Sequence, residues 1–288
     1  MNPPATHSYP DSNPTISILG CGWLGLPLGV ALAAQGWQVK GSTTSPQKLE
    51  QLAAGGLQPF LFRFNPALEG DSLHKFIDFL STDVLIISIP PKAEANGSDF
   101  HRLQIQQLIS HLKEASITKV IYISSTSVYP DLNREVTETE PLPQEGTNIT
   151  MWQAESLLQS LAPVVQTTVL RCGGLMGYNR MAGRYVAGKK GLTTGSIRVN
   201  FVHRDDVIRV IEAVIQQEKW GKTYNVVAPL HPTRREIYLQ NAADFKLVPP
   251  EFAKDSAQPF KIISASKLIE ELKYTFLYPD PLQFPYAF

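Results

Sequence analysis

The sequence has few cysteines, no excess of either charge and no long hydrophobic run. Cys21 and Cys172 form no CxxC pair, which argues against a disulfide or a metal cluster and favours a reducing compartment. Lys plus Arg and Asp plus Glu number 26 each, so no net field attracts nucleic acid or an anionic membrane. No window approaches the roughly 18 apolar residues of a membrane helix. We therefore expect a cytoplasmic protein whose partner is a small-molecule substrate, and no metal.

Residues 1–14 are rich in Pro, Ser and Asn and contain neither a basic start nor an apolar stretch. This composition predicts a disordered tail and not a signal peptide. The remaining chain, with 43% apolar residues overall, is long enough for one large core or a core plus a smaller lobe.

Short β-branched runs alternate with helical patterns over residues 15–172. The expected strands are 15–20, 37–43, 83–90, 119–125 and 167–171, and the expected helices are 26–36, 45–56, 100–115 and 152–162. This alternation is typical of right-handed βαβ crossovers. It predicts an α/β fold of the Rossmann type, with a doubly wound parallel sheet covered on both faces.

The chain becomes glycine-rich and irregular after Arg171, which suits loops over a cleft. We expect 15–172 to form an NAD(P)-binding Rossmann domain that 199–228 rejoins, and 173–198 and 229–288 to form a small C-terminal α-rich substrate lobe. Asp205 or Asp206 is expected to cap a helix within 203–219 that precedes a strand at 223–227. Another helix is expected near residues 264–273.

The segment ILGCGWLGLPLG places a GxGxxG pattern between an apolar strand and a helix. Gly20 permits a tight turn, Gly22 lets backbone amides approach a pyrophosphate, and Gly25 allows close packing of helix on strand. The phosphates would lie at the helix N-terminus. We expect the whole turn, including Cys21, Trp23 and Leu24, to bind a dinucleotide. Cys21 and Trp23 equally suit packing.

An NAD-selective site usually has a carboxylate about 20 residues after the glycine turn, at the end of the second strand. This sequence has Ser42, Thr43 and Thr44 there, followed by Lys48. Hydroxyl and ammonium groups suit a 2′-phosphate, so NADP is favoured and NAD remains possible. A polar turn with Ser45 capping the next helix is the alternative.

The run DVLIISIPP ends at the sheet edge where the glycine turn is expected. Because ligands bind at that edge near the topological switch point, Ser88, Ile89 and Pro90 are expected to border the cofactor. The prolines could instead simply end the strand.

Three further segments resemble the extended short-chain dehydrogenases/reductases, the group of NAD-dependent epimerases and dehydratases. They are ISSTSVYP at 123–130, TVLRCGGLMG at 168–177 and VNFVHRDDVIRVI at 199–211. The glycine turn makes the chain most similar to the atypical, YeeZ-type members. The resemblance implies a Rossmann fold and cofactor contacts at Ser124, Arg171 and Gly173. Helices of the Rossmann domain would form a homodimer interface.

The resemblance also implies a catalytic Ser, Tyr and Lys. Ser125 takes the serine role, but the YxxxK positions hold Thr147 and Met151, neither of which titrates near neutral pH. Tyr129 is the candidate to replace the missing tyrosine, or it packs in the cleft.

Residues of the later segments are candidates for substrate binding. Arg184, with Lys189, could enter the cleft from the second lobe, or could be a solvated loop charge. His203 could bind substrate, or could order the turn before its helix.

Two functions compete. The first is an NADP-dependent oxidoreductase or epimerase/dehydratase-like enzyme acting on a small carbonyl or sugar-type substrate. The second is a non-catalytic redox sensor or scaffold that binds NADP(H), which the missing YxxxK pair favours. A β-hydroxyacid dehydrogenase would share the glycine turn, but it leaves the segments at 123–130 and 203–208 unexplained.

Overall fold

The computed structural model describes residues 14–63, 71–91, 97, 99–115 and 117–287. The tail predicted over residues 1–14 lies outside them except for Pro14. The chain divides into two compact units. The N-terminal unit comprises Met1–Ile121 and Pro163–Gln166, and the C-terminal unit comprises Tyr122–Ala162 and Thr167–Phe288.

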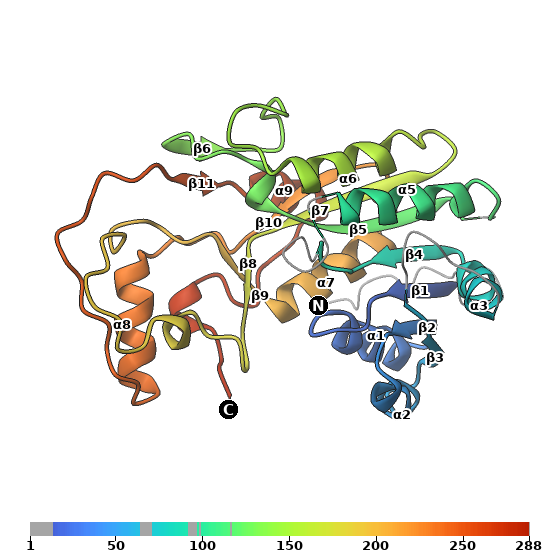
Figure 1. The fold of residues 1–288 in the computed structure, drawn as a ribbon, viewed down its shortest axis with the longest axis horizontal. Coiled ribbons are helices and arrows are strands. Elements are labelled where there is room, and N and C mark those ends of the chain that lie inside the picture. The colour runs from blue at the N-terminus through green and yellow to red at the C-terminus, as the bar shows by residue number, and fades with distance from the viewer. Residues whose placement is uncertain (1–13, 64–70, 92–96, 98, 116, 288) are drawn as a thin grey trace, which may run out of the picture. The chain divides into compact units, whose positions relative to one another are not determined.

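The N-terminal unit alternates strands and helices (Figure 1). Its elements are β1 (Thr15–Leu19), α1 (Gly25–Ala34), β2 (Gln38–Thr43), η1 (Pro46–Lys48), α2 (Leu49–Ala54), β3 (Gln58–Leu61), α3 (Asp71–Leu80), β4 (Val84–Ile87) and α5 (Phe100–Leu112). The next strand, β5 (Lys119–Ser125), begins in this unit and ends in the C-terminal unit.

The C-terminal unit holds the remaining elements. They are η2 (Thr126–Val128), β6 (Arg134–Val136), α6 (Ile149–Gln159), β7 (Gln166–Cys172), β8 (Gly174–Met176), η3 (Ala182–Val186), β9 (Phe201–His203), α7 (Arg204–Gln216), β10 (Thr223–Val226), α8 (Arg234–Asp244), β11 (Lys261–Ile263), α9 (Ser266–Leu272) and η4 (Pro281–Gln283).

Seven strands form one sheet in the order β10-β7-β5-β4-β1-β2-β3. The pairs β1–β2, β1–β4, β2–β3 and β7–β10 are parallel. The order reverses between β1 and β4, which makes their carboxyl ends the topological switch point. This sheet, with its flanking helices, confirms the predicted Rossmann fold.

The central strands are buried over most of their length because helices cover both faces of the sheet. Ile16, Ile18, Leu85 and Ile87 are all fully buried. A strand covered on both faces needs no alternation of polar and apolar residues. This is why β4 could be recognised from a continuous apolar run, and β1 from its β-branched and apolar residues.

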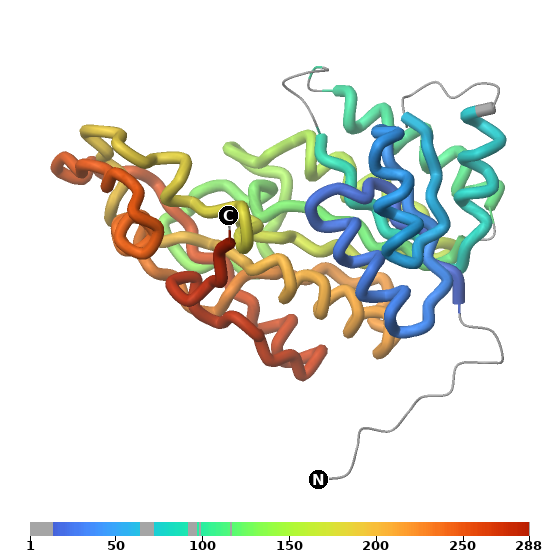
Figure 2. Tube along the Cα trace, turned by 90° about the horizontal axis from the view of Figure 1, so that it is seen from below, coloured from blue at the N-terminus to red at the C-terminus, as the bar shows by residue number. Residues whose placement is uncertain are grey.

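Two small parallel sheets, β8–β9 and β6–β11, lie in the C-terminal unit. The C-terminal run of the chain, dark red in Figure 2, lies against the segment around Tyr178, which accepts a hydrogen bond from Ala287 N and donates one to Pro285 O. The Asp206 carboxylate holds the same run, because it accepts from Leu277 N and Tyr278 N at 2.7 and 3.0 Å.

Two predicted details of the secondary structure were wrong, and two elements of the N-terminal unit were missed. The cap of α7 is His203, whose Nδ1 accepts from Asp205 N at 3.2 Å, so neither aspartate has that role. α6 begins three residues before the predicted helix because the Asn148 side chain caps it by accepting from Met151 N. The short strand β3 and the helix α3 were not predicted. The division into a Rossmann domain and a substrate lobe stays a prediction.

Candidate functional site

The turn between β1 and α1 has the three features that a dinucleotide site requires. Gly20 has a φ of +103°, and a Cβ there would lie 2.9 Å from Ser88 O. A Cβ on Gly25 would lie 2.3 Å from Gly20 O, so the helix can approach the strand only with glycine. A Cβ on Gly22 would meet nothing within 4 Å, and the residue is exposed. Two glycines therefore serve packing, while Gly22 leaves open space for a ligand.

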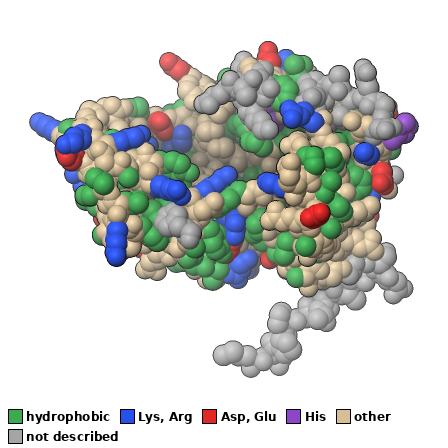
Figure 3. Space-filling view, turned by 60° about the horizontal axis from the view of Figure 1, so that its bottom comes forward, with side chains coloured by type: hydrophobic (Ala, Val, Ile, Leu, Met, Phe, Trp, Pro, Cys, Tyr) green, Lys and Arg blue, Asp and Glu red, His purple; other side chains and the backbone are tan. Residues whose placement is uncertain are grey.

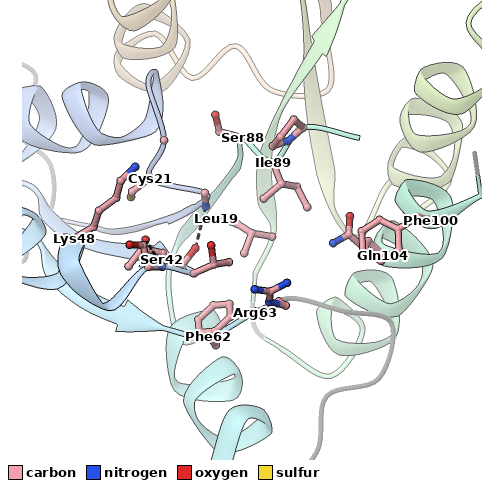
Figure 4. Close-up of a pocket in the computed structure, with 16 residues that line it drawn as sticks. Leu19, Cys21, Ser42, Lys48, Phe62, Arg63, Ser88, Ile89, Phe100 and Gln104 are labelled. Carbon is pink, nitrogen blue, oxygen red and sulfur yellow. Dashed lines mark hydrogen bonds between the residues drawn. The ribbon is translucent and has the colours of Figure 1, made fainter. Parts of the chain in front are cut away.

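A pocket of about 320 Å³ opens at this turn, within the N-terminal unit (Figure 4). Most predicted cofactor residues line it: Gly20, Cys21, Gly22, Ser42, Thr43, Thr44, Lys48, Ser88, Ile89 and Pro90. Leu19, Ser45, Phe62, Arg63, Phe100 and Gln104 also line it and were not predicted. The volume falls within the range of ligand sites, about 300–1,000 Å³.

The end of β2 is tied directly to the glycine turn. Ser42 Oγ accepts from Gly20 N at 2.9 Å, and Ser42 O accepts from Cys21 N at 2.8 Å. Thr43 Oγ1 accepts from Ser45 N at 3.1 Å. Ser42 and Thr43 are therefore buried parts of the turn, whereas Thr44 and Lys48 are exposed. No carboxylate lines the described part of this pocket.

Cys21 lies in the pocket wall as a protonated thiol. Burial raises its pKa to about 12, although a hydrogen bond with the Ser42 backbone and the nearby Lys48 ammonium lower it. Burial likewise raises the pKa of Cys172 to about 12. Neither thiol is therefore an activated nucleophile at neutral pH.

Three predicted residues of the turn do not line the pocket: Trp23, Leu24 and Gly25. Leu24 is buried and precedes α1 without a side-chain cap. Gly25 serves the packing described above. Their role as cofactor contacts stays a prediction.

Ser124 and Ser125 end β5 and differ in environment. Ser124 is buried, and its hydroxyl donates to Glu155 Oε1 at 2.5 Å. Ser125 is half-buried, and its oxygen accepts from Ser127 N at 3.1 Å. Among the described residues the Ser125 hydroxyl proton has no acceptor, whereas the Ser124 hydroxyl donates within the fold.

Arg171 and Tyr129 belong to a buried polar network in the C-terminal unit. Arg171 Nη2 donates to Glu155 Oε2 at 2.7 Å, and Nη1 donates to the Tyr129 oxygen at 2.6 Å. The Tyr129 hydroxyl donates in turn to Asn225 Oδ1 at 2.8 Å. Tyr129 is fully buried, and burial raises its pKa to about 12, partly offset by Arg171. These bonds argue against Tyr129 as a proton donor and against Arg171 as a cofactor contact.

The two positions at which the YxxxK pair was expected, Thr147 and Met151, lie around the N-terminus of α6. Thr147 Oγ1 accepts from Gln144 N at 2.9 Å. Met151 is buried, and its sulfur accepts from the Tyr122 hydroxyl at 3.9 Å. Neither residue supplies a titratable group in the place of the usual pair.

The structure gives His203 and Gly173 internal contacts. His203 is fully buried and packs against Tyr178, Tyr278 and Phe284, with ring centroids 4.2–5.4 Å apart. Burial lowers its pKa, and its Nδ1 caps α7. Substrate binding by His203 stays a prediction. A Cβ on Gly173 would lie 2.3 Å from Asn200 O, which explains this glycine without a cofactor.

Basic side chains gather on the C-terminal unit around α8 and η3 (Figure 3, left). Residues 173–202 contain five Lys or Arg and no Asp or Glu. Arg184 is exposed in η3, and Lys190 pairs with Glu251 at 3.0 Å. This surface leaves Arg184 as a candidate for binding an anionic substrate.

Two kinds of site are absent from the described residues. No group of three or more His, Cys, Asp or Glu side chains there could hold a metal ion. No helix in the described parts of the chain is long and apolar enough to span a bilayer.

The parallel sheet and the glycine-turn pocket define a Rossmann-type dinucleotide-binding class, and comparison with known proteins identifies the family. The chain belongs to the NAD-dependent epimerase/dehydratase family, whose model matches residues 16–227. Protein YeeZ of Escherichia coli (strain K12) is 38% identical over 275 residues, which cover 94% of this chain and 98% of YeeZ. This confirms the predicted resemblance.

Solved structures share the fold. The UDP-N-acetylglucosamine 4-epimerase of Bacillus cereus has a TM-score of 0.74 at 19% identity, over 94% of this chain and 97% of that one. A short-chain dehydrogenase/reductase superfamily protein from Agrobacterium tumefaciens, with bound NAD, has a TM-score of 0.73 at 17% identity, over 93% and 94%.

Proposed function

We propose that this protein is an NADP-dependent oxidoreductase or epimerase/dehydratase-like enzyme that acts on a small carbonyl or sugar-type substrate. The observation that carries the proposal is the pocket at the glycine turn, where Gly22 faces open space and Ser88 and Ile89 border the same cavity. The family and the relatives with bound NAD support a nicotinamide dinucleotide in this place.

The preference for NADP over NAD rests on the ribose end of the pocket. A carboxylate that bonds the 2′-hydroxyl would repel a 2′-phosphate, and no Asp or Glu lines the described pocket. Thr44 and Lys48 are exposed there and offer a hydroxyl and an ammonium group. These groups suit a dianion better than a neutral hydroxyl.

Ser125 is the residue we propose to hold the substrate carbonyl, since its hydroxyl proton is available for donation. The epimerase relative acts on a UDP-linked sugar, and the basic surface around Arg184 suits an anionic substrate of that kind. We also propose a cytoplasmic location and a homodimer. Light scattering of the purified protein tests the dimer.

The second candidate function is a redox sensor or scaffold that binds NADP(H) without turning it over. The specific observation in its favour is the burial of Met151 and the engagement of Thr147 Oγ1 by Gln144 N. In that case the pocket would still bind a dinucleotide, but no proton donor would act beside it.

Titration of the protein with NADPH and NADH, followed by ligand fluorescence, tests the binding site. Oxidation of NADPH with a panel of aldehydes, ketones and nucleotide sugars tests the chemistry. We expect tighter binding of NADPH and turnover with at least one panel member. Binding without turnover supports the sensor, and binding of neither cofactor contradicts both functions.

The variant Ser125→Ala sharpens the enzymatic test. Loss of a hydrogen bond to the reacting oxygen should lower kcat about 100-fold, while the Kd for NADPH stays unchanged. The matched control is Ser160→Ala, because the exposed Ser160 hydroxyl donates only to Leu157 O. Equal turnover by the two variants would contradict the role of Ser125.

A further inference from the structure

We propose that Arg63, two residues after the third strand, selects NADP over NAD by binding the 2′-phosphate. This inference rests on the proposed dinucleotide function and adds a specificity residue that lies outside the glycine turn and outside the loop after β2. It is carried by the register of β3 against β2 and by the charges that line the pocket.

The register places Arg63 beside the loop that follows β2. In the parallel pair, Thr43 lies opposite Leu61. The pairing extends one residue further, because Phe62 N donates to Thr43 O at 3.2 Å. Arg63 therefore follows directly beside Thr44 and Ser45, the position at which a Rossmann protein contacts the adenosine ribose.

The two cations that line the pocket come from different elements. Lys48 ends η1 and Arg63 follows β3, and both line the pocket. In Figure 4 their side chains lie on the two sides of Ser42. Phe62, beside Arg63 in sequence, is buried against Phe76 and Phe79. This packing fixes the backbone from which the Arg63 side chain extends.

The Arg63 guanidinium makes no hydrogen bond or ion pair with the residues that the structure describes, and it is exposed. Another arginine of the same unit, Arg102, pairs with Asp99 at 3.4 Å and donates to Gln106. A guanidinium that lines a pocket with no carboxylate among its described lining residues retains its donors for a ligand. Its planar fork matches two oxygens of a phosphate.

A 2′-phosphate is the part of a dinucleotide that this arrangement fits. The pyrophosphate belongs at the glycine turn and the N-terminus of α1, where Gly22 leaves room. The second anionic group of NADP is attached to the adenosine ribose, beside the loop after β2. Lys48 and Arg63 would neutralise its two charges, and NAD has no group there to engage them.

Equilibrium titration of the full chain with NADPH and NADH tests the proposal. We expect Arg63→Ala to raise the Kd for NADPH about tenfold or more, as for the loss of a charge-assisted hydrogen bond. The Kd for NADH should change less than about threefold, because NADH lacks the 2′-phosphate. Arg63→Gln, which keeps most of the side-chain volume, should give the same selectivity change. The control Lys75→Ala removes an exposed cation of α3 outside the pocket.

The outcomes separate this inference from the proposed function. An unchanged ratio of the two Kd values in both Arg63 variants overturns the role of Arg63 and leaves dinucleotide binding intact. Wild-type protein that binds NADH as tightly as NADPH overturns the selectivity itself. Wild-type protein that binds neither cofactor overturns the proposed function and this inference together.

Discussion

The glycine-turn pocket and the network around Arg171 use their charged residues in opposite ways. In the N-terminal unit, Lys48 and Arg63 are exposed on the pocket and make no ion pair with the described residues. In the C-terminal unit, the side chains of Arg171 and Glu155 are 9% and 1% exposed and are bonded to each other. Cations that line a cavity without a partner indicate a ligand-binding site. A buried ion pair with its hydrogen bonds made indicates a structural role.

The largest expected effect comes from breaking the buried pair. Arg171→Ala would leave the Glu155 carboxylate without its counter-ion, and we expect the free energy of unfolding to fall by about 3–5 kcal/mol. Urea denaturation measures the loss. The control Lys190→Ala removes an exposed partner of Glu251 and should cost less than about 1 kcal/mol. Similar losses in both variants would contradict the structural role of Arg171.

The next effect distinguishes the roles of Gly22 and Gly25 in the glycine turn. Gly25→Ala places a Cβ against Gly20 O and should destabilise the protein by about 1–3 kcal/mol. Gly22→Ala places its Cβ in open space, so the stability should change by less than about 0.5 kcal/mol. Dinucleotide binding should nevertheless weaken about tenfold, because the methyl group occupies the approach to the backbone.

Thermal unfolding and NADPH titration of both variants measure these two effects. Full-strength binding by folded Gly22→Ala would argue against a pyrophosphate at this turn. A loss of stability in Gly22→Ala as large as in Gly25→Ala would show that both glycines serve packing.

The last effect is confined to alkaline pH. Burial raises the pKa of Tyr129 from 10 to about 12, so the folded protein holds this proton over a range in which the unfolded chain loses it. The raised pKa of Tyr129 contributes fully to the free energy of unfolding below pH 10, and this contribution is lost as the pH rises to 12. Tyr129→Phe should make the fall in unfolding free energy shallower there, by up to about 1.4 kcal/mol per pH unit. Denaturation series at several pH values measure the slope, and identical slopes would contradict the prediction.

The sequence predicted the features that depend on local pattern. The apolar runs of β1 and β4 indicated strands because strands buried on both faces are continuously hydrophobic. Gly20, Gly22 and Gly25 indicated the turn because their spacing reflects backbone geometry within a few residues. Lys48 was placed in the pocket because it follows that strand–turn–helix unit closely in sequence.

Other features depend on contacts between distant segments. β3 has four residues, too few for a clear period, and without it Arg63 has no place in the pocket. Tyr129, Glu155 and Arg171 are far apart in sequence, so short motifs could not show that their side chains are bonded. The motifs therefore assigned Tyr129 to catalysis and Arg171 to cofactor binding. His203 caps α7 through Nδ1, although the adjacent aspartates are the more common capping residues.

The Rossmann fold and the place of the dinucleotide turn could be predicted from the sequence, because they follow from periodicity and from glycines whose backbone role is local. The family followed from the resemblance of short motifs. Which polar residues are open to a ligand depends on the tertiary structure. Sheet register places Arg63 beside the loop after β2, and burial assigns Tyr129 and Arg171 to the interior. Both depend on contacts between residues that are far apart in sequence, and a sequence pattern gives no spatial distance between such residues.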